Sequence, residues 1–419
     1  MKRWGFFLII FIFLTPYTLK AEEVPLTLDQ AIAIALRDNR DILLKGEDVK
    51  KAKLKIAEAE ASLFPALSFT GGWTDTRGSY SKDLAQFTTQ TTLKQYLYKG
   101  GEIINTIRLN EHGLTVAQAI LDKTKLEMVL NVKKAFYTLL LANEFVDLNK
   151  GILDNTQEHL DFLLQRYTNG QASESDVLKV GASVESIKEA YEASLNQMES
   201  AQVLLSNLLY LDKDTKIKPN AQLNYEAQEV AYDEAFLKAM HMRPEIRQYE
   251  AQTKAAQKAV QIAKADNRPS IYASWDYYSR SHLATGTSRN WNDYNVIGLT
   301  FSWPIFDGWA TKAKVEQAIV DLKEAQLTKE KTIADIALEL KNAYLDLKNA
   351  IAKMKSTQSE VGVYKDTFSV TQDKYKAGIA SSLDLDDTSL GYKVSLFNQK
   401  EAIYDYVLAK ARFDKATGE

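Results

Sequence analysis

The sequence predicts a mainly α-helical protein with a small β part. We expect two structural repeats of long coiled-coil helices, with four amphipathic strands in the whole chain. Three observations lead to this fold class: a motif that occurs twice, long stretches without proline, and short segments of alternating polarity. The duplication comes first, because a repeated unit governs the architecture into which every local motif must fit.

The repeated motif occupies residues 166–178 and again residues 374–386, an offset of 208 positions. Both copies place a basic residue, Tyr, Gly, Ala-Ser and Asp at the same spacing. Upstream of Pro269 the offset falls to 204, so the second copy has four extra residues between Pro269 and Phe306. Such an insertion is typical of a surface loop. The two predicted repeats are residues 22–220 and 221–419.

Two stretches of the chain lack proline, between Pro65 and Pro219 and after Pro304, and both are rich in good helix formers. Apolar residues recur in them at alternating spacings of three and four, the period of a left-handed coiled coil. The first copy carries Met128, Val132, Ala135, Leu139, Ala142 and Val146, and the second carries Ile333, Ile336, Leu340, Ala343, Leu347, Ala350 and Met354. A helix over about residues 102–167 would be on the order of 100 Å long. The alternative is several ordinary helices, interrupted at Gly113 or Gly151.

Four segments alternate between apolar and small or polar residues, as strands with one exposed face do. They are residues 66–75, 87–97, 271–279 and 294–303. Their length, about ten residues, suits tilted strands that cross a bilayer, although a soluble hairpin would show the same alternation. Four strands cannot close a membrane barrel, which needs at least eight, and lipid does not tolerate open strand edges. If these strands enter a membrane, several chains must therefore pool them.

Residues 1–21 predict a signal peptide. Lys2 and Arg3 precede an apolar run that ends at Leu14 and is too short to span a bilayer comfortably, and Ala21 offers a small residue for cleavage. A retained anchor helix is the alternative.

The composition argues against catalysis. The chain has no cysteine, four scattered histidines, no glycine-rich phosphate loop and no G-x-S-x-G elbow, so we expect no catalytic, metal or cofactor site. Loss of Lys2, Arg3 and Lys20 with the predicted signal peptide would take the net charge from −3 to −6, and this mild acidity argues against nucleic acid as a partner.

Taken together, these features resemble the TolC family of outer membrane efflux proteins. The resemblance rests on the doubled Tyr-x-x-Gly-x-Ala-Ser-x-x-Asp motif, on the proline-bounded strand pairs, and on the Pro-Ile-Phe-Asp-Gly run at residues 304–308. It implies a homotrimer in which twelve strands form one shared β-barrel in the outer membrane, on an α-helical tunnel that crosses the periplasm. The implied function is a passive exit duct for substrates from an inner-membrane pump and a periplasmic adaptor protein.

The resemblance also implies site residues. The turns at Gly170 and Gly378 would be the tips at which the adaptor docks. Asp384 and Asp387 match positions whose side chains ring the tunnel entrance. Asp386 lies beside them and is expected to face away from the ring. Without the resemblance, these residues would be interpreted as a helical turn and as an acidic first turn that favours the helix dipole.

The resemblance further implies an entrance latch. Tyr375 and Asp176 match hydrogen-bonded partners that hold the entrance of such a tunnel shut. The family's latch also uses an arginine, and this chain has Ala380 at that position. We therefore predict a looser or differently secured closed state.

Two other functions remain open from the sequence: a periplasmic adaptor protein and a soluble coiled-coil scaffold. Adaptors also combine a signal peptide with long coiled-coil hairpins. The duplication along the whole chain and the paired amphipathic strands count against both.

Overall fold

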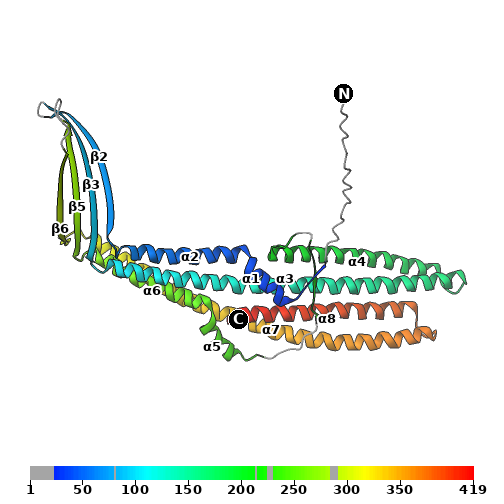
Figure 1. Cartoon of the computed structure of the whole chain (residues 1–419). Coiled ribbons are helices and arrows are strands. Elements are labelled where there is room, and N and C mark those ends of the chain that lie inside the picture. The colour runs from blue at the N-terminus through cyan, green and yellow to red at the C-terminus, as the bar shows by residue number, and fades with distance from the viewer. Residues whose placement is uncertain (1–22, 80–81, 213–214, 224–229, 284–290) are drawn as a thin grey trace, which may run out of the picture. The chain divides into compact units, whose positions relative to one another are not determined.

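A computed structural model describes residues 23–79, 82–212, 215–223, 230–283 and 291–419 (Figure 1). The described chain is mainly helical, with one four-stranded sheet and one two-stranded sheet. The elements are β1 Glu23–Leu26, α1 Leu28–Asp38, α2 Arg40–Ala61, β2 Ala66–Ser79, β3 Lys82–Lys99, α3 Glu102–Thr168, α4 Glu174–Leu209, β4 Lys216–Pro219, α5 Tyr232–Met242, α6 Pro244–Ala265, β5 Ser270–Leu283, β6 Trp291–Ser302, α7 Ala310–Lys376 and α8 Ser382–Thr417. The predicted signal peptide lies outside the described residues.

The helices come in pairs of equal length. α1 and α5 have 11 residues each, α2 and α6 have 22, α3 and α7 have 67, and α4 and α8 have 36. The packing divides the chain differently, into two compact units that each take segments from both halves of the sequence. The boundary between the repeats at residues 220 and 221 therefore stays a prediction.

We call the two compact units the hairpin unit and the sheet unit. Among the described residues, the hairpin unit comprises 23–35, 132–212, 215–223 and 360–404, and the sheet unit comprises 36–79, 82–131, 230–283, 291–359 and 405–419. The hairpin unit holds the connection from α3 to α4, the connection from α7 to α8, and the short parallel pair of β1 and β4.

The sheet unit contains an antiparallel sheet in the order β2-β3-β5-β6. Its strands extend beyond the predicted segments at most ends, to 14, 18, 14 and 12 residues. The register places Thr92 of β3 opposite Asp276 of β5, and the Thr92 hydroxyl donates to that carboxylate over 2.6 Å. The other face carries exposed apolar side chains, among them Phe69 at 72% and Ile297 at 83%. The sheet therefore has one hydrogen-bonded polar face and one apolar face that is exposed to solvent.

The predicted coiled-coil stripes are buried except at Val146 and Ile333, which are of intermediate exposure. Val132 and Leu139 in α3 and Leu340 in α7 are fully inaccessible, and the other stripe residues between Ile336 and Met354 are also buried. α3 and α7 are continuous over 67 residues, so each is on the order of 100 Å long. Gly113 and Gly151 lie inside α3 and do not end it, which excludes the alternative of interrupted helices.

A buried arginine connects three elements of the sheet unit. Arg243, between α5 and α6, is 4% exposed and donates to the Glu245 carboxylate and to Glu339 of α7. It also donates to the backbone carbonyls of Lys415 and Ala416 in α8. Burial tends to raise the pKa of the Glu339 carboxyl, but bonds from Lys415 and Arg243 outweigh it and hold that pKa below its ordinary value. Every carboxylate of this cluster thus faces a cation.

Candidate functional site

The two helical turns of the hairpin unit have the same geometry. Gly170 and Gly378 adopt φ values of 71° and 75°, in the left-handed region that favours glycine. At the first turn the Gln171 N–H donates to the Arg166 carbonyl over 2.8 Å, and at the second the Ile379 N–H donates to the Lys374 carbonyl over 2.9 Å. This is the Schellman motif, which pairs the last carbonyls of α3 and α7.

The helices that leave these turns begin differently. Ser173 caps α4 by accepting a hydrogen bond from the Asp176 N–H over 3.1 Å. Ser381 caps α8 in the same way through the Asp384 N–H, and the Asp384 carboxylate in turn accepts from the Ser381 N–H at 2.9 Å and hydroxyl at 2.7 Å. This reciprocal pair is a capping box. It holds the pKa of the Asp384 carboxyl below its ordinary value.

Asp387 and Asp386 lie on the next turn of α8 and line a cleft of about 920 Å³. Asp387 is exposed, and the Asp386 side chain is about half-buried, with 49% of its surface accessible. The cleft takes its other walls from α3, α4 and α7, with His159, Val180 and Phe368 among its lining residues. The predicted ring residues therefore differ in environment: the Asp384 carboxylate is engaged by its own helix terminus, and Asp387 faces a cleft.

Asp386 is turned toward α3. Its Oδ1 lies 3.7 Å from Nδ1 of His159, a residue that the sequence alone did not single out. Burial raises the pKa of the Asp386 carboxyl, and Asp387 and Asp176 act in the same direction, against the attraction of His159 and Lys393. No spacing in the sequence could have indicated this contact, because His159 and Asp386 come from different halves of the chain.

Tyr375 lies against the same histidine. Its ring meets the His159 ring edge-on, with centroids 6.4 Å apart. Within the described residues, no hydrogen bond joins the side chains of Tyr375 and Asp176, so the latch between them stays a prediction. Asp176 is close enough to Asp386 to affect its pKa, so residues of all four helices contribute to this polar region.

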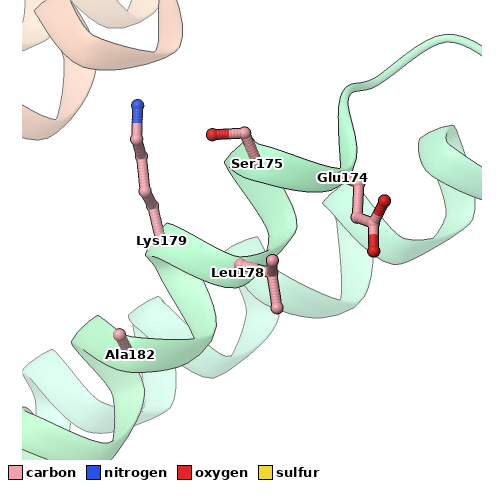
Figure 2. Close-up of a pocket in the computed structure, with 5 residues that line it drawn as sticks. All are labelled: Glu174, Ser175, Leu178, Lys179 and Ala182. Carbon is pink, nitrogen blue, oxygen red and sulfur yellow. The ribbon is translucent and has the colours of Figure 1, made fainter.

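A second hollow lies at the start of α4. Figure 2 shows its lining residues along the first turns of this helix: Glu174, Ser175, Leu178, Lys179 and Ala182. Leu178 is 66% exposed, and at the second turn Ile379 is 78% exposed. Apolar side chains that stand beside charged ones on an exposed surface are typical of a protein-binding surface.

The described part of the chain contains no group of three His, Cys, Asp or Glu residues placed to hold a metal ion. Among the helices of the described residues, none is long and apolar enough to cross a membrane.

Curated relatives match over nearly the whole chain. The alkaline protease secretion protein AprF of Pseudomonas aeruginosa is 21% identical over 92% of this chain and 84% of its own. The antibiotic efflux pump outer membrane protein ArpC of Pseudomonas putida is 24% identical over 90% of this chain and 78% of its own.

Solved structures share the fold. The open state of the Neisseria gonorrhoeae MtrE outer membrane channel aligns with a TM-score of 0.79 at 18% identity, over 93% of this chain and 88% of that one. The Campylobacter jejuni CmeC outer membrane channel aligns with a TM-score of 0.77 at 19% identity, over 93% and 85%.

A comparison with protein families matches residues 31–209 and 237–419 to the family described as outer membrane efflux protein. These two ranges cover most of the chain and include all six predicted site residues. The chain belongs to the outer membrane efflux protein family.

Proposed function

We propose that this chain is the outer membrane exit duct of a tripartite export system, which receives substrates from an inner-membrane pump through a periplasmic adaptor protein. Membership of the outer membrane efflux protein family supports the duct and its location in the outer membrane. Because the members of this family are channel proteins, membership argues against the two other functions, a periplasmic adaptor and a coiled-coil scaffold. The energy for export would come from the pump, since a duct needs no chemistry of its own.

The single observation that carries the proposal is the four-stranded sheet. β2 and β6 are its edge strands, and its apolar face is exposed. An open sheet edge and an exposed apolar face are both costly in water, and an open edge is costly in lipid as well. Three chains would pool twelve strands, close the sheet into a barrel and turn the apolar face toward lipid. We therefore propose a homotrimer.

The two turns of the hairpin unit are the proposed docking tips for the adaptor. Gly170 and Gly378 fix two similar tips in each chain, so a trimer presents six. Exposed Leu178 and Ile379 beside these turns supply apolar contact area, and Lys179 and Glu174 around Leu178 supply polar rim contacts (Figure 2).

Asp384 and Asp387 form the proposed acidic ring at the tunnel entrance. They are three residues apart on α8, so their side chains lie on one face of the helix. Three copies of each would stack two rings of negative charge, which favour cations and impede anions. The low pKa of Asp384 supports this role, because that carboxyl keeps its charge to a lower pH than an ordinary aspartate does.

The proposal is tested by the conductance of purified protein in planar lipid bilayers. We expect discrete channels that select cations, and we expect Asp384→Asn combined with Asp387→Asn to lower the cation-to-anion permeability ratio several-fold. Absence of channels would contradict the duct. Channels whose selectivity survives both substitutions would contradict the acidic ring alone.

The same bilayer recording tests the proposed latch. Tyr375→Phe removes the phenol hydroxyl and keeps the ring that contacts His159. A latch that uses this hydroxyl predicts a higher open probability in the variant. Unchanged open probability and conductance would show that Tyr375 does not secure the entrance through a hydrogen bond.

A further inference from the structure

A histidine and an aspartate connect the two helical hairpins within the hairpin unit. His159 lies on α3, about two turns before the helix ends at Thr168, and Asp386 lies on the first turns of α8. Their Nδ1 and Oδ1 atoms are 3.7 Å apart, and the His159 side chain is 18% exposed while that of Asp386 is 49% exposed. One partner of the pair is thus shielded and the other remains in reach of water.

The second nitrogen of His159 has an unusual environment. Nε2 is buried, and among the described residues no hydrogen-bond partner reaches it. Burying a ring nitrogen without a partner costs free energy. A histidine placed this way therefore depends on its other nitrogen, and Nδ1 faces Asp386.

Lys393 of α8 is a further basic residue near this pair. Its Nζ donates to the Thr156 hydroxyl of α3 over 3.4 Å, one helical turn before His159. Burial lowers the pKa of this lysine, and the charge of Asp386 acts against that shift. His159 and Lys393 thus both interact electrostatically with Asp386.

The charged and titratable groups around His159 come from all four helices. They are Glu158 on α3, Asp176 and Lys179 on α4, Tyr375 on α7, and Asp386, Asp387 and Lys393 on α8. Acidic groups outnumber basic ones in this set.

We propose that the His159–Asp386 pair is the closing contact of the entrance, which takes the place of the arginine that is absent at Ala380, and that a proton on His159 strengthens it. The proposal rests on the proposed function as an exit duct. The pair joins α8, which carries the ring residues Asp384 and Asp387, to α3 of the other hairpin. Moving α8 away from α3 would separate the His159 imidazole from the Asp386 carboxylate.

The direction of the pH effect follows from the charges. As the pH falls from 7.5 to 5.5, an ordinary histidine changes from mostly neutral to mostly charged. The attraction to Asp386 then increases, so the closed entrance becomes more stable. We expect the open probability of the wild-type channel to fall several-fold over this range.

Three variants test the proposal in planar bilayers at pH 7.5 and 5.5. His159→Gln removes the titrating charge, so we expect the pH dependence to disappear and the open probability at pH 5.5 to exceed that of wild type several-fold. His159→Lys is charged at both pH values, so we expect it to be closed at both. Asp386→Asn removes the partner, and we expect a phenotype like that of His159→Gln, with no further effect when the two are combined.

His112→Gln is the matched control, because His112 also lies on α3 but belongs to the sheet unit. It should keep the wild-type pH dependence. The proposal is overturned if His159→Gln and His159→Lys both retain the wild-type pH profile, or if the effects of His159→Gln and Asp386→Asn simply add. A wild-type protein that forms no channels would instead contradict the duct itself, so the two failures are distinguishable.

Discussion

Asp176 and Asp384 occupy equivalent positions in the repeated motif, but they bond differently. Asp384 completes a capping box with Ser381. At the first turn the Ser173 hydroxyl accepts from the Asp176 N–H, but among the described residues the Asp176 carboxylate accepts no bond from Ser173 in return. The carboxylate of Asp176 is thus left to act on its neighbours in the cleft, including Asp386. In a duplicated chain, a gate can arise from such differences between the two copies.

The cap of α8 gives a first prediction. Ser381→Ala removes the hydroxyl from the capping box and should cost about 1 kcal/mol, or roughly a fivefold faster hydrogen exchange of the first-turn amides of α8. The low pKa of Asp384 means that the box is fully formed above the ordinary pKa of an aspartate and is lost as the pH falls through the lowered value. Ser173→Ala is the control, and it should affect its helix less. Equal effects at both turns would contradict a stronger cap at Ser381.

The arginine cluster gives a second prediction. Arg243→Met would leave the buried Glu245 and its neighbour Glu339 without their shared cation and should destabilise the sheet unit by about 3 kcal/mol. Arg247→Met breaks an exposed pair with Asp122 and should cost less than about 1 kcal/mol. Thermal unfolding in detergent measures both, and a similar shift in midpoint for the two variants would refute the distinction.

The same cluster predicts an acid dependence of stability. The pKa of Glu339 is lowered in the folded state, so its contribution is fully present above the ordinary pKa of a glutamate and is lost as the pH falls through the lowered value. We expect the unfolding midpoint of the wild type to drop in that acidic range. The Arg243→Met variant should show a smaller drop, because one of the two cations that lower this pKa is missing and only Lys415 remains.

The helices and turns are the elements that the sequence predicts best. The 3.5-residue stripes and the absence of proline indicate the long helices, and Gly170 and Gly378 at matching positions indicate the turns. Strand ends are harder to predict: β3 begins at Lys82, five residues before the predicted segment at 87–97. Those extra strand residues are paired with β2 and β5 across the sheet, a constraint that local alternation does not contain.

The second helical turn gives a prediction of its own. Gly378→Ala forces a side chain into the left-handed region, and a Cβ there would meet nothing within 4 Å, so the expected cost of about 1 kcal/mol is purely conformational. Gly362→Ala, inside α7 with equally open space around it, should instead stabilise the helix by up to about 1 kcal/mol. Hydrogen exchange of the α7–α8 connection measures both. A stabilising Gly378→Ala would show that the turn is not held in the left-handed conformation.

For the whole molecule, the sequence predicts the duplication and the family but not the way in which the chain packs. The two compact units cut across the repeats, because residues from both halves contribute to each. The contact between His159 and Asp386 belongs to this level: neither residue stands out in its own segment, and only the folded hairpin unit brings them together. The contact proposed to control the entrance therefore lies where segments from the two halves of the chain pack together in the hairpin unit.

A single introduced cysteine tests most directly whether the hairpin unit is the mouth of a duct. The chain has no cysteine, so Asp387→Cys would carry the only thiol. A bulky charged thiol reagent added to the periplasmic side of a bilayer should reduce the current through this variant to a small fraction and leave the wild-type current unchanged. A current that stays unchanged after labelling is confirmed by mass would contradict the placement of Asp387 at the entrance of the duct.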